Sequence, residues 1–212
     1  HFMTKKLFTR SLNEPYKLSR TGIDLFIKCP RCFYLEKKWG VKRPGGPPFT
    51  LNAAVDTLLK REFDLHRAAR TSHPLMKAYG LDLVPFSHPE LDQWRNKGIW
   101  VFHQPTEFLL GGLIDDLWVN SQGELIVVDY KATAKSGEVT LTDTEWHQSY
   151  KRQIEFYQWL FRQQGFQVSD TGYFVYSNCK KEQEIFDGRL EFEVVLLPYV
   201  GRDSWVEPTL LK

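Results

Sequence analysis

Long hydrophobic runs and low-complexity segments are both absent from this sequence. No stretch approaches the roughly 20 consecutive apolar residues that a membrane-spanning helix requires. The start of the chain lacks the charged and apolar regions of a secretion signal. We therefore expect a cytoplasmic protein that makes no contact with a membrane.

Three common catalytic signatures are also missing. The chain has no Ser/His/Asp order, no Walker-type phosphate loop and no glycine-rich dinucleotide turn. No serine-hydrolase, P-loop or dinucleotide-binding assignment therefore competes with the site described below. His88, His103 and His147 have no partner pattern, and we interpret them as structural.

Cysteine is scarce. Cys29, Cys32 and Cys179 do not make an even disulfide set. Cys29 and Cys32 form a C-x-x-C pair, but with one distant cysteine they fall short of a four-thiolate zinc or iron–sulfur site. We expect free cysteines in a reducing compartment, with a structural metal as the less favoured alternative.

The length of 212 residues allows one good core, or at most a large and a small lobe. A hydrophobic content of 42% and a charged content of 25% are ordinary for a globular protein. We interpret residues 1–3 as the remnant of a tag and residues 4–212 as a single domain.

Positive charge is concentrated near the N-terminus. The first 50 residues hold eleven lysines and arginines against three acidic residues, whereas the remainder of the chain has an excess of acid. This distribution indicates a contact with a polyanion and a separate cation-binding site. A solvated basic face without a ligand would explain it as well.

The order of the expected elements indicates a mixed α/β fold built on one small sheet. Residues 18–39 are expected to be helical, with Ser19 or Thr21 as the cap and a break at Pro30. A loop at 43–48 leads to a helix over 50–70, followed by a largely irregular stretch over 72–98. Residues 98–120 are expected to contain one or two strands, followed by a turn at Ser121–Gly123 and a strand that ends at Thr133. A helix that ends at Gly165 and strands over 170–178 and 189–200 complete the chain.

Acidic residues lie where the apolar strands end. Antiparallel pairing around Ser121–Gly123 brings Asp115, at the end of the first strand, close to Asp129 on the second. Asp129 and Lys131 are two residues apart and project from one face, while Tyr130 points away but leaves its carbonyl nearby. By the same alternation, Asp116 is turned away from Asp115.

Two carboxylates within about 5 Å resist joint ionisation unless a cation lies between them. Mg²⁺ or Mn²⁺ resolves this conflict, because both prefer oxygen ligands and keep several waters. Such an ion activates water and polarises a phosphoryl oxygen, and Lys131 would orient the attacking water. The pattern therefore predicts hydrolysis of phosphodiesters. The alternative is that both acids are solvated strand ends with Lys131 as their salt-bridge partner.

The segments GGLID, VVDYKAT and QIEFY, taken in this order, resemble the PD-(D/E)XK nuclease superfamily in its RecB-like branch, which includes CRISPR-associated exonucleases. The likeness covers about residues 19–180 and implies a restriction-endonuclease-like α/β core, with a small mixed central sheet flanked by helices (catalytic core 99–180) and an N-terminal helical flank that contacts DNA (19–70). It implies that Asp115, Asp129 and the Tyr130 carbonyl bind the metal, and that Lys131 is catalytic.

The sequence departs from that branch at two places. Many relatives have a metal-binding histidine on the helix before the sheet, where this chain offers Asp56, which we take as a third metal ligand. An exposed helical aspartate is the alternative, and His66 is a less favoured ligand. Cys29 matches the N-terminal cysteine of an iron–sulfur cluster, but the C-terminal trio is missing, so we expect no cluster in this chain.

Gln153 and Tyr157 share one helix face and match a further motif of the branch, so we expect them to support the scissile strand or the residues behind the site. Basic residues among aromatic ones near the N-terminus suit single-stranded or frayed DNA. Phe33 is expected in the core, and Trp39 is left open. The predicted phosphate contacts are Lys37, Lys38, Lys42 and Arg43.

These observations lead to one preferred hypothesis and two others. The preferred one is a Mg²⁺- or Mn²⁺-dependent deoxyribonuclease that acts as an exonuclease or on single-stranded or frayed DNA. The second is a catalytically inactive or partner-dependent DNA-binding module, with a helicase or a CRISPR or repair protein as its partner. The third is a metal-free interaction module.

Overall fold

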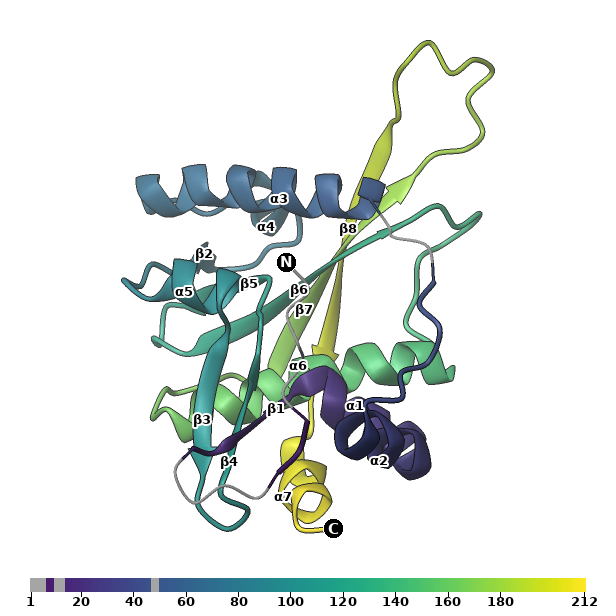
Figure 1. The fold of residues 1–212 in the computed structure, drawn as a ribbon. Coiled ribbons are helices and arrows are strands. Elements are labelled where there is room, and N and C mark those ends of the chain that lie inside the picture. Colours follow the sequence, from purple (N-terminus) through teal and green to yellow (C-terminus); the bar gives the residue numbers. More distant parts are fainter. Residues whose placement is uncertain (1–6, 10–13, 47–49) are drawn as a thin grey trace.

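The computed structural model describes residues 7–9, 14–46 and 50–212, so the loop predicted at 43–48 lies partly outside the described residues. Helices predominate in the first part of the chain, and most strands follow residue 98 (Figure 1). The helices are α1 (Arg20–Lys28), α2 (Pro30–Trp39), α3 (Thr50–Ala69), α4 (Pro74–Ala78), α5 (Leu91–Asn96), α6 (Glu145–Gln163) and α7 (Val206–Leu210). The strands are β1 (Tyr16–Ser19), β2 (Leu83–Pro85), β3 (Ile99–His103), β4 (Phe108–Gly112), β5 (Asp116–Asn120), β6 (Leu125–Thr133), β7 (Thr171–Cys179) and β8 (Phe192–Val200).

The strands form two sheets, and the prediction of one small sheet is wrong. Strands β1, β4 and β3 make the first, and β2, β5, β6, β7 and β8 make the second. The chain leaves the first sheet after Gly112 and enters the second at Asp116, so the stretch expected to hold one or two strands holds three. The predicted mixed α/β class with flanking helices is confirmed.

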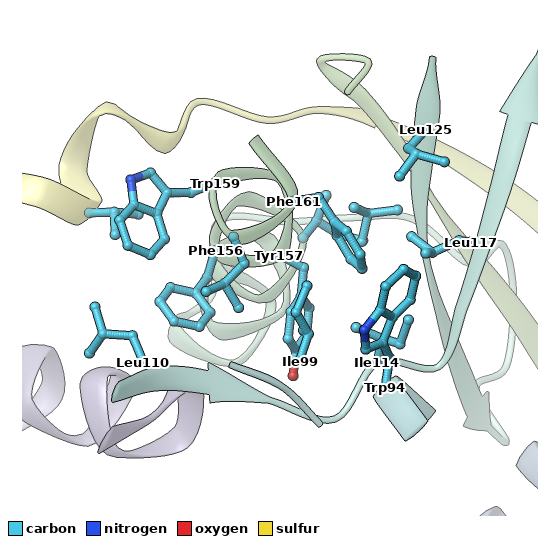
Figure 2. Packing of buried hydrophobic residues seen from close by; sticks show 14 of the residues in the cluster. Trp94, Ile99, Leu110, Ile114, Leu117, Leu125, Phe156, Tyr157, Trp159 and Phe161 are labelled. Carbon is cyan, nitrogen blue, oxygen red and sulfur yellow. The ribbon is translucent and has the colours of Figure 1, made fainter. Parts of the chain in front are cut away.

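Helix α6 covers one face of the larger sheet, and its apolar side is the centre of the main core (Figure 2). Phe156, Leu160 and Phe161 pack there with Leu117 and Phe174. Each such side chain contributes about 1.5–3 kcal/mol when it is removed from water. Because β6 residues alternate between faces, Asp129 and Lys131 share the α6 face with Val127.

Helix α3 covers the opposite face. Leu59 and Phe63 pack against Trp118 of β5 and against Val128 and Tyr130 of β6. These strand residues point to the α3 face of the sheet, opposite to the face of Asp129. Phe63 and Trp118 stack with ring centroids 5.3 Å apart. The side chain of Tyr130 therefore belongs to the core under α3, as the strand alternation predicted.

The helix ends follow the expected chemistry. Ser19 Oγ accepts a hydrogen bond from Gly22 N and caps α1, which decides between the two predicted caps. Thr144 caps α6 in the same way, and Gly165, with φ at 87°, follows its end as predicted. Asp24 on α1 accepts hydrogen bonds from Arg152 and Ser149 on α6, which fixes α1 beside the start of α6.

A disulfide joins Cys29 and Cys32, so the expectation of free cysteines is wrong for this pair. Cys29 caps α2 and Cys32 lies in its first turn, which brings their Cα atoms to 5.2 Å, within the ordinary range for a disulfide. Cys179 is free at the end of β7. In the described ranges no helix combines the length and the apolar character needed to cross a membrane.

Candidate active site

Asp115 and Asp129 lie side by side where β5 begins. Pairing of β5 with β6 runs to Asp116 opposite Val128, so Asp115 comes next to Asp129, although it precedes β5 and does not close a strand. Asp115 Oδ2 accepts a hydrogen bond of 2.9 Å from Tyr130 N and so takes the place of a strand partner. Lys131 Nζ forms an ion pair with Asp129. The structure thus brings together the three residues predicted to carry the chemistry.

Asp129 is the most buried of these three residues. Its side chain is 3% exposed, and neither carboxylate oxygen has a hydrogen bond of ordinary geometry. Burial raises the pKa of Asp129 to about 7; Lys131 acts against this shift and the charge of Asp115 adds to it. A buried carboxylate that has one lysine as its partner and faces a second acid is a site that a hard divalent cation would stabilise.

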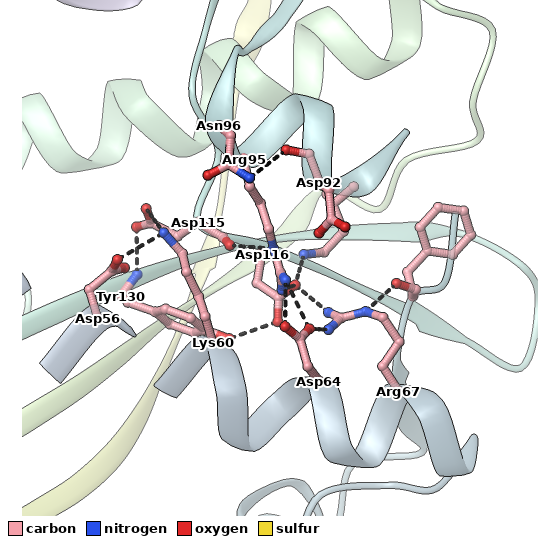
Figure 3. A network of polar contacts seen from close by, with 12 residues as sticks. Asp56, Lys60, Asp64, Arg67, Asp92, Arg95, Asn96, Asp115, Asp116 and Tyr130 are labelled. Carbon is pink, nitrogen blue, oxygen red and sulfur yellow. Dashed lines mark hydrogen bonds and ion pairs between the residues drawn. The ribbon is translucent and has the colours of Figure 1, made fainter. Parts of the chain in front are cut away.

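Asp56 and Lys60 approach this pair from α3. They form an i,i+4 ion pair at 2.9 Å, and Lys60 Nζ lies 3.7 Å from Asp115 Oδ1 (Figure 3). Asp56 therefore reaches the acid pair through Lys60 and not directly. Across the described residues, no three histidine, cysteine, aspartate or glutamate side chains gather closely enough to enclose a metal ion. The role of Asp56 as a third ligand stays a prediction.

Asp56 and Lys131 also line a small cavity of about 100 Å³ at the end of β6. Its remaining wall combines the start of α3, the end of β6 and one aromatic ring of α6. Lys131 Nζ lies 4.3 Å from the centroid of that ring, which belongs to Tyr150. The other lining residues are Asn52, Val55, Leu59, Tyr130 and Ala132.

Behind the acid pair, Asp116 is the centre of a buried ionic cluster (Figure 3). Its side chain is fully buried and accepts from Arg67 and, at 2.5 Å, from Arg95. Tyr130 Oη donates to its second oxygen at 2.7 Å. Asp64 of α3 pairs with both arginines. Asp116 thus points away from Asp115, as the alternation predicted.

This cluster also holds the backbone that carries Asp115. Arg95 Nε donates to the carbonyl oxygen of Asp115 at 3.1 Å. Although burial alone lowers the pKa of Arg95, the carboxylates of Asp116 and Asp64 raise it above its ordinary value. The guanidinium therefore stays charged, and it ties α5, α3 and the start of β5 to one point.

Tyr157 fixes the other side of the same loop. Its hydroxyl donates to the carbonyl oxygen of Leu113, and burial raises its pKa, with the charges of Asp115 and Asp129 adding to the effect while Arg20 opposes it. A Cβ atom at Gly112 would lie 2.7 Å from the Tyr157 hydroxyl, so this contact requires glycine at that position. Tyr157 is therefore placed to position the acidic loop from behind.

The other predicted substrate residues are less closely tied to the acids. Gln153 is half-buried on α6, four residues before Tyr157. Lys37 lies against α1, with its side chain 13% exposed and paired with Glu36, whereas Lys38, Lys42 and Arg43 are exposed. Their contact with a substrate stays a prediction. His66 packs against His73 and Thr71 near the end of α3, and Phe33 packs against the core as expected.

Sequence reasoning missed four basic residues around the acids. The ion pair of Lys60 with Asp56 could have been predicted, because Lys60 lies one helical turn after Asp56. Arg20, the first residue of α1, acts on Tyr157 from a segment far away in the sequence. Arg67 and Arg95 reach Asp116 from α3 and α5, a convergence that no local spacing reveals.

Comparison with known families agrees with this geometry. A model of the family described as the PD-(D/E)XK nuclease superfamily matches residues 17–197. The match begins in β1 and ends in β8, so it includes both sheets, the acid pair and α6. No curated protein matches the chain.

Proposed function

The chain belongs to the PD-(D/E)XK nuclease superfamily, and from this premise we propose that it is a Mg²⁺- or Mn²⁺-dependent nuclease that hydrolyses phosphodiester bonds of DNA. The observation that carries the proposal is the buried carboxylate of Asp129 beside Asp115 and Lys131. In the restriction-endonuclease-like fold of this chain, Asp115 lies just before β5 and Asp129 and Lys131 lie on the neighbouring strand β6. A phosphodiester would approach them from the side of Asp115 that faces solvent.

The donor set fits a hard divalent cation. Asp115 and Asp129 would hold it, with the carbonyl of Tyr130 as a neutral ligand and Asp56 completing the set from α3. A cation bound there would lower the pKa of a water and offset the charge that develops on the phosphoryl oxygens. Asp115 is 23% exposed, which leaves the side of the pair that faces solvent open to a phosphate.

Lys131 is the residue that would act on the reacting atoms. Its ammonium is held by Asp129 on one side and by the face of the Tyr150 ring on the other. In that position it donates hydrogen bonds to the attacking water or to a non-bridging phosphate oxygen, and it stabilises the charge of the transition state. Lys60 provides a second ammonium on the far side of Asp115.

The biological setting is proposed from the sequence likeness. We place the chain in the RecB-like branch, as a single domain acting in the cytoplasm on single-stranded or frayed DNA, with a helicase or a CRISPR or repair protein as its partner. Residues 19–70 would guide the strand through Lys37, Lys38, Lys42 and Arg43, while residues 99–180 carry the chemistry and Gln153 supports the strand.

A digestion assay tests this function. We expect purified protein with Mn²⁺ or Mg²⁺ to degrade linear DNA, and excess EDTA to stop the reaction because the acid pair then lacks its cation. Linear double-stranded, circular and single-stranded DNA are compared by gel electrophoresis. The variant Lys131→Ala should lose about 100-fold or more in rate, and Lys77→Ala, which removes an exposed lysine of α4, serves as the matched control.

The outcomes separate the hypotheses. Cleavage of linear but not circular DNA identifies an exonuclease. DNA binding without cleavage under any of these metals would contradict the nuclease proposal and favour a partner-dependent binding module. A protein that binds neither metal nor DNA would contradict both and leave an interaction module.

A further inference from the structure

An exposed tryptophan lies beside the proposed active site without a core role. Trp146, in the first turn of α6, is 62% exposed. Its neighbour one turn further, Tyr150, lines the cavity that also contains Asp56 and Lys131. The two aromatic rings therefore extend the site from the catalytic lysine towards solvent.

The position of Trp146 is fixed by Tyr150. The indole N–H of Trp146 donates to the hydroxyl of Tyr150, and the two ring centroids are 5.7 Å apart at an interplanar angle of 69°. With the indole N–H satisfied within the protein, the exposed part of the ring is apolar surface. An oriented indole open to solvent is a surface on which a planar ligand can stack.

The distance to the chemistry suits a nucleotide. Lys131 Nζ lies 4.3 Å from the Tyr150 centroid, and the Trp146 centroid is a further 5.7 Å from Tyr150. The indole is therefore at most about 10 Å from the ammonium, a span of about three stacked nucleotides and fewer in an extended strand. A base stacked on Trp146 would belong to the same strand as a phosphate held at Lys131.

Lysines also lie near the start of α6, beside the residue that follows Trp146. Burial lowers the pKa of His147, and the charges of Lys135 and Lys151 lower it further, so both lysines lie close to this residue. Lys151 is 16% exposed and pairs with Asp143, whose carboxylate is 90% exposed, so the ion pair is weak. Lys135 is exposed and is the lysine more open to a phosphate. Sites that bind single-stranded nucleic acids commonly combine exposed aromatic rings, on which bases stack, with lysines that contact the phosphates.

We propose that Trp146, supported by Tyr150, is a stacking platform for an unpaired nucleobase close to the cleaved phosphate, and that it makes single-stranded DNA or a frayed end the preferred substrate. This inference rests on the proposed nuclease function. Bases inside a duplex have both faces covered by their neighbours, so a base in the interior of a duplex cannot place a face on the indole, whereas an unpaired base can. Trp146 acts as a specificity-determining residue and takes no part in bond cleavage.

Binding and cleavage measured separately test the platform. The protein is titrated into fluorescein-labelled single-stranded or hairpin-duplex oligonucleotides in a buffer with Ca²⁺, and binding is followed by fluorescence anisotropy. Thermal melting of each protein variant checks that it is folded. Trp146→Ala should weaken single-strand binding by about 5- to 100-fold with little change for duplex, and Trp146→Phe should restore most of the affinity. Tyr79→Ala, which removes an exposed aromatic ring after α4, is the matched control.

Kinetics in Mg²⁺ or Mn²⁺ give the second measurement. The platform predicts that Trp146→Ala raises KM for single-stranded DNA and leaves kcat nearly unchanged. The platform would be overturned if Trp146→Ala bound single-stranded DNA as tightly as wild type, or if it lost as much affinity for duplex as for single-stranded DNA. It would also be overturned if folded wild-type protein bound no DNA. If wild type cuts DNA and Trp146→Ala behaves like it, only the platform fails. If nothing is cut but the selective loss of binding remains, only the nuclease proposal fails.

Discussion

Replacing Asp129 by asparagine is expected to slow cleavage strongly and, at the same time, to stabilise the metal-free protein above neutral pH. The loss of a charged ligand removes several kcal/mol of transition-state stabilisation. Each 1.36 kcal/mol is a factor of ten, so we expect a fall in rate of roughly 1000-fold. Asp82→Asn, which removes an exposed carboxylate just before β2, is the control and should cut normally.

The gain in stability follows from the raised pKa. Asp129 titrates near 7 in the folded chain and near 4 when unfolded, so between these values the folded state holds a proton that the unfolded state lacks. Its contribution to stability is complete below about pH 4 and is lost as the pH rises through about 7. A difference of about three pKa units between the folded and unfolded states corresponds to a loss of at most about 4 kcal/mol in the free energy of unfolding.

Urea unfolding in EDTA at several pH values measures this effect. The difference in unfolding free energy between Asp129→Asn and wild type should grow from pH 4 to pH 8 and then level, because asparagine does not titrate. Asp82→Asn should show no such trend. A wild-type stability that increases with pH over this range, relative to Asp129→Asn, would contradict the buried placement of the carboxylate.

Replacing Asp116 by alanine is expected to cause the largest loss of stability in this region. The side chains of Arg67 and Arg95 are 9% and 6% exposed, and without Asp116 only the partly exposed carboxylate of Asp64 would be left to pair with them. Breaking a buried pair in this way costs about 3–5 kcal/mol. The hydroxyl of Tyr130 would lose its acceptor as well.

Unfolding by urea at pH 7.5 measures that cost. Asp170→Ala is the matched control, because Asp170 is 74% exposed in its ion pair with Arg162 and should contribute less than about 1 kcal/mol. Since Arg95 also donates to the Asp115 carbonyl, the folded fraction of Asp116→Ala should cut more slowly than wild type. If Asp116→Ala and Asp170→Ala had the same free energy of unfolding, the ionic cluster around Asp116 would not be important for stability.

The central part of the site could be predicted because its determinants are local. Strand alternation separates Asp129 and Lys131 from Tyr130, and a turn at residues 121–123 sets the register that brings Asp115 opposite. The contact from Tyr130 N to Asp115 confirms this register. The caps and stops of α1 and α6 were readable for the same reason, since each depends on one or two neighbouring side chains.

The parts that were missed depend on distant contacts. The separate three-stranded sheet depends on the pairing of β4 with β1, which lies about 90 residues earlier in the chain, and on a close approach at Gly111, where a Cβ would lie 2.0 Å from the carbonyl oxygen of Ile99. Arg67 and Arg95 meet Asp116 across the fold, and an arginine on a helix reads as a solvated residue until its partner is known. The disulfide was missed because the compartment, and not the spacing, guided the prediction for Cys29 and Cys32.

Titration of Mn²⁺ into the protein by calorimetry, without DNA, tests most directly whether Asp115 and Asp129 share a cation. Wild type should bind the ion, Asp115→Asn and Asp129→Asn should each weaken binding by more than about 100-fold, and Asp82→Asn should bind like wild type. Mn²⁺ binding that is equal in wild type and in both site variants would contradict the account, because the acid pair would then not be the metal site.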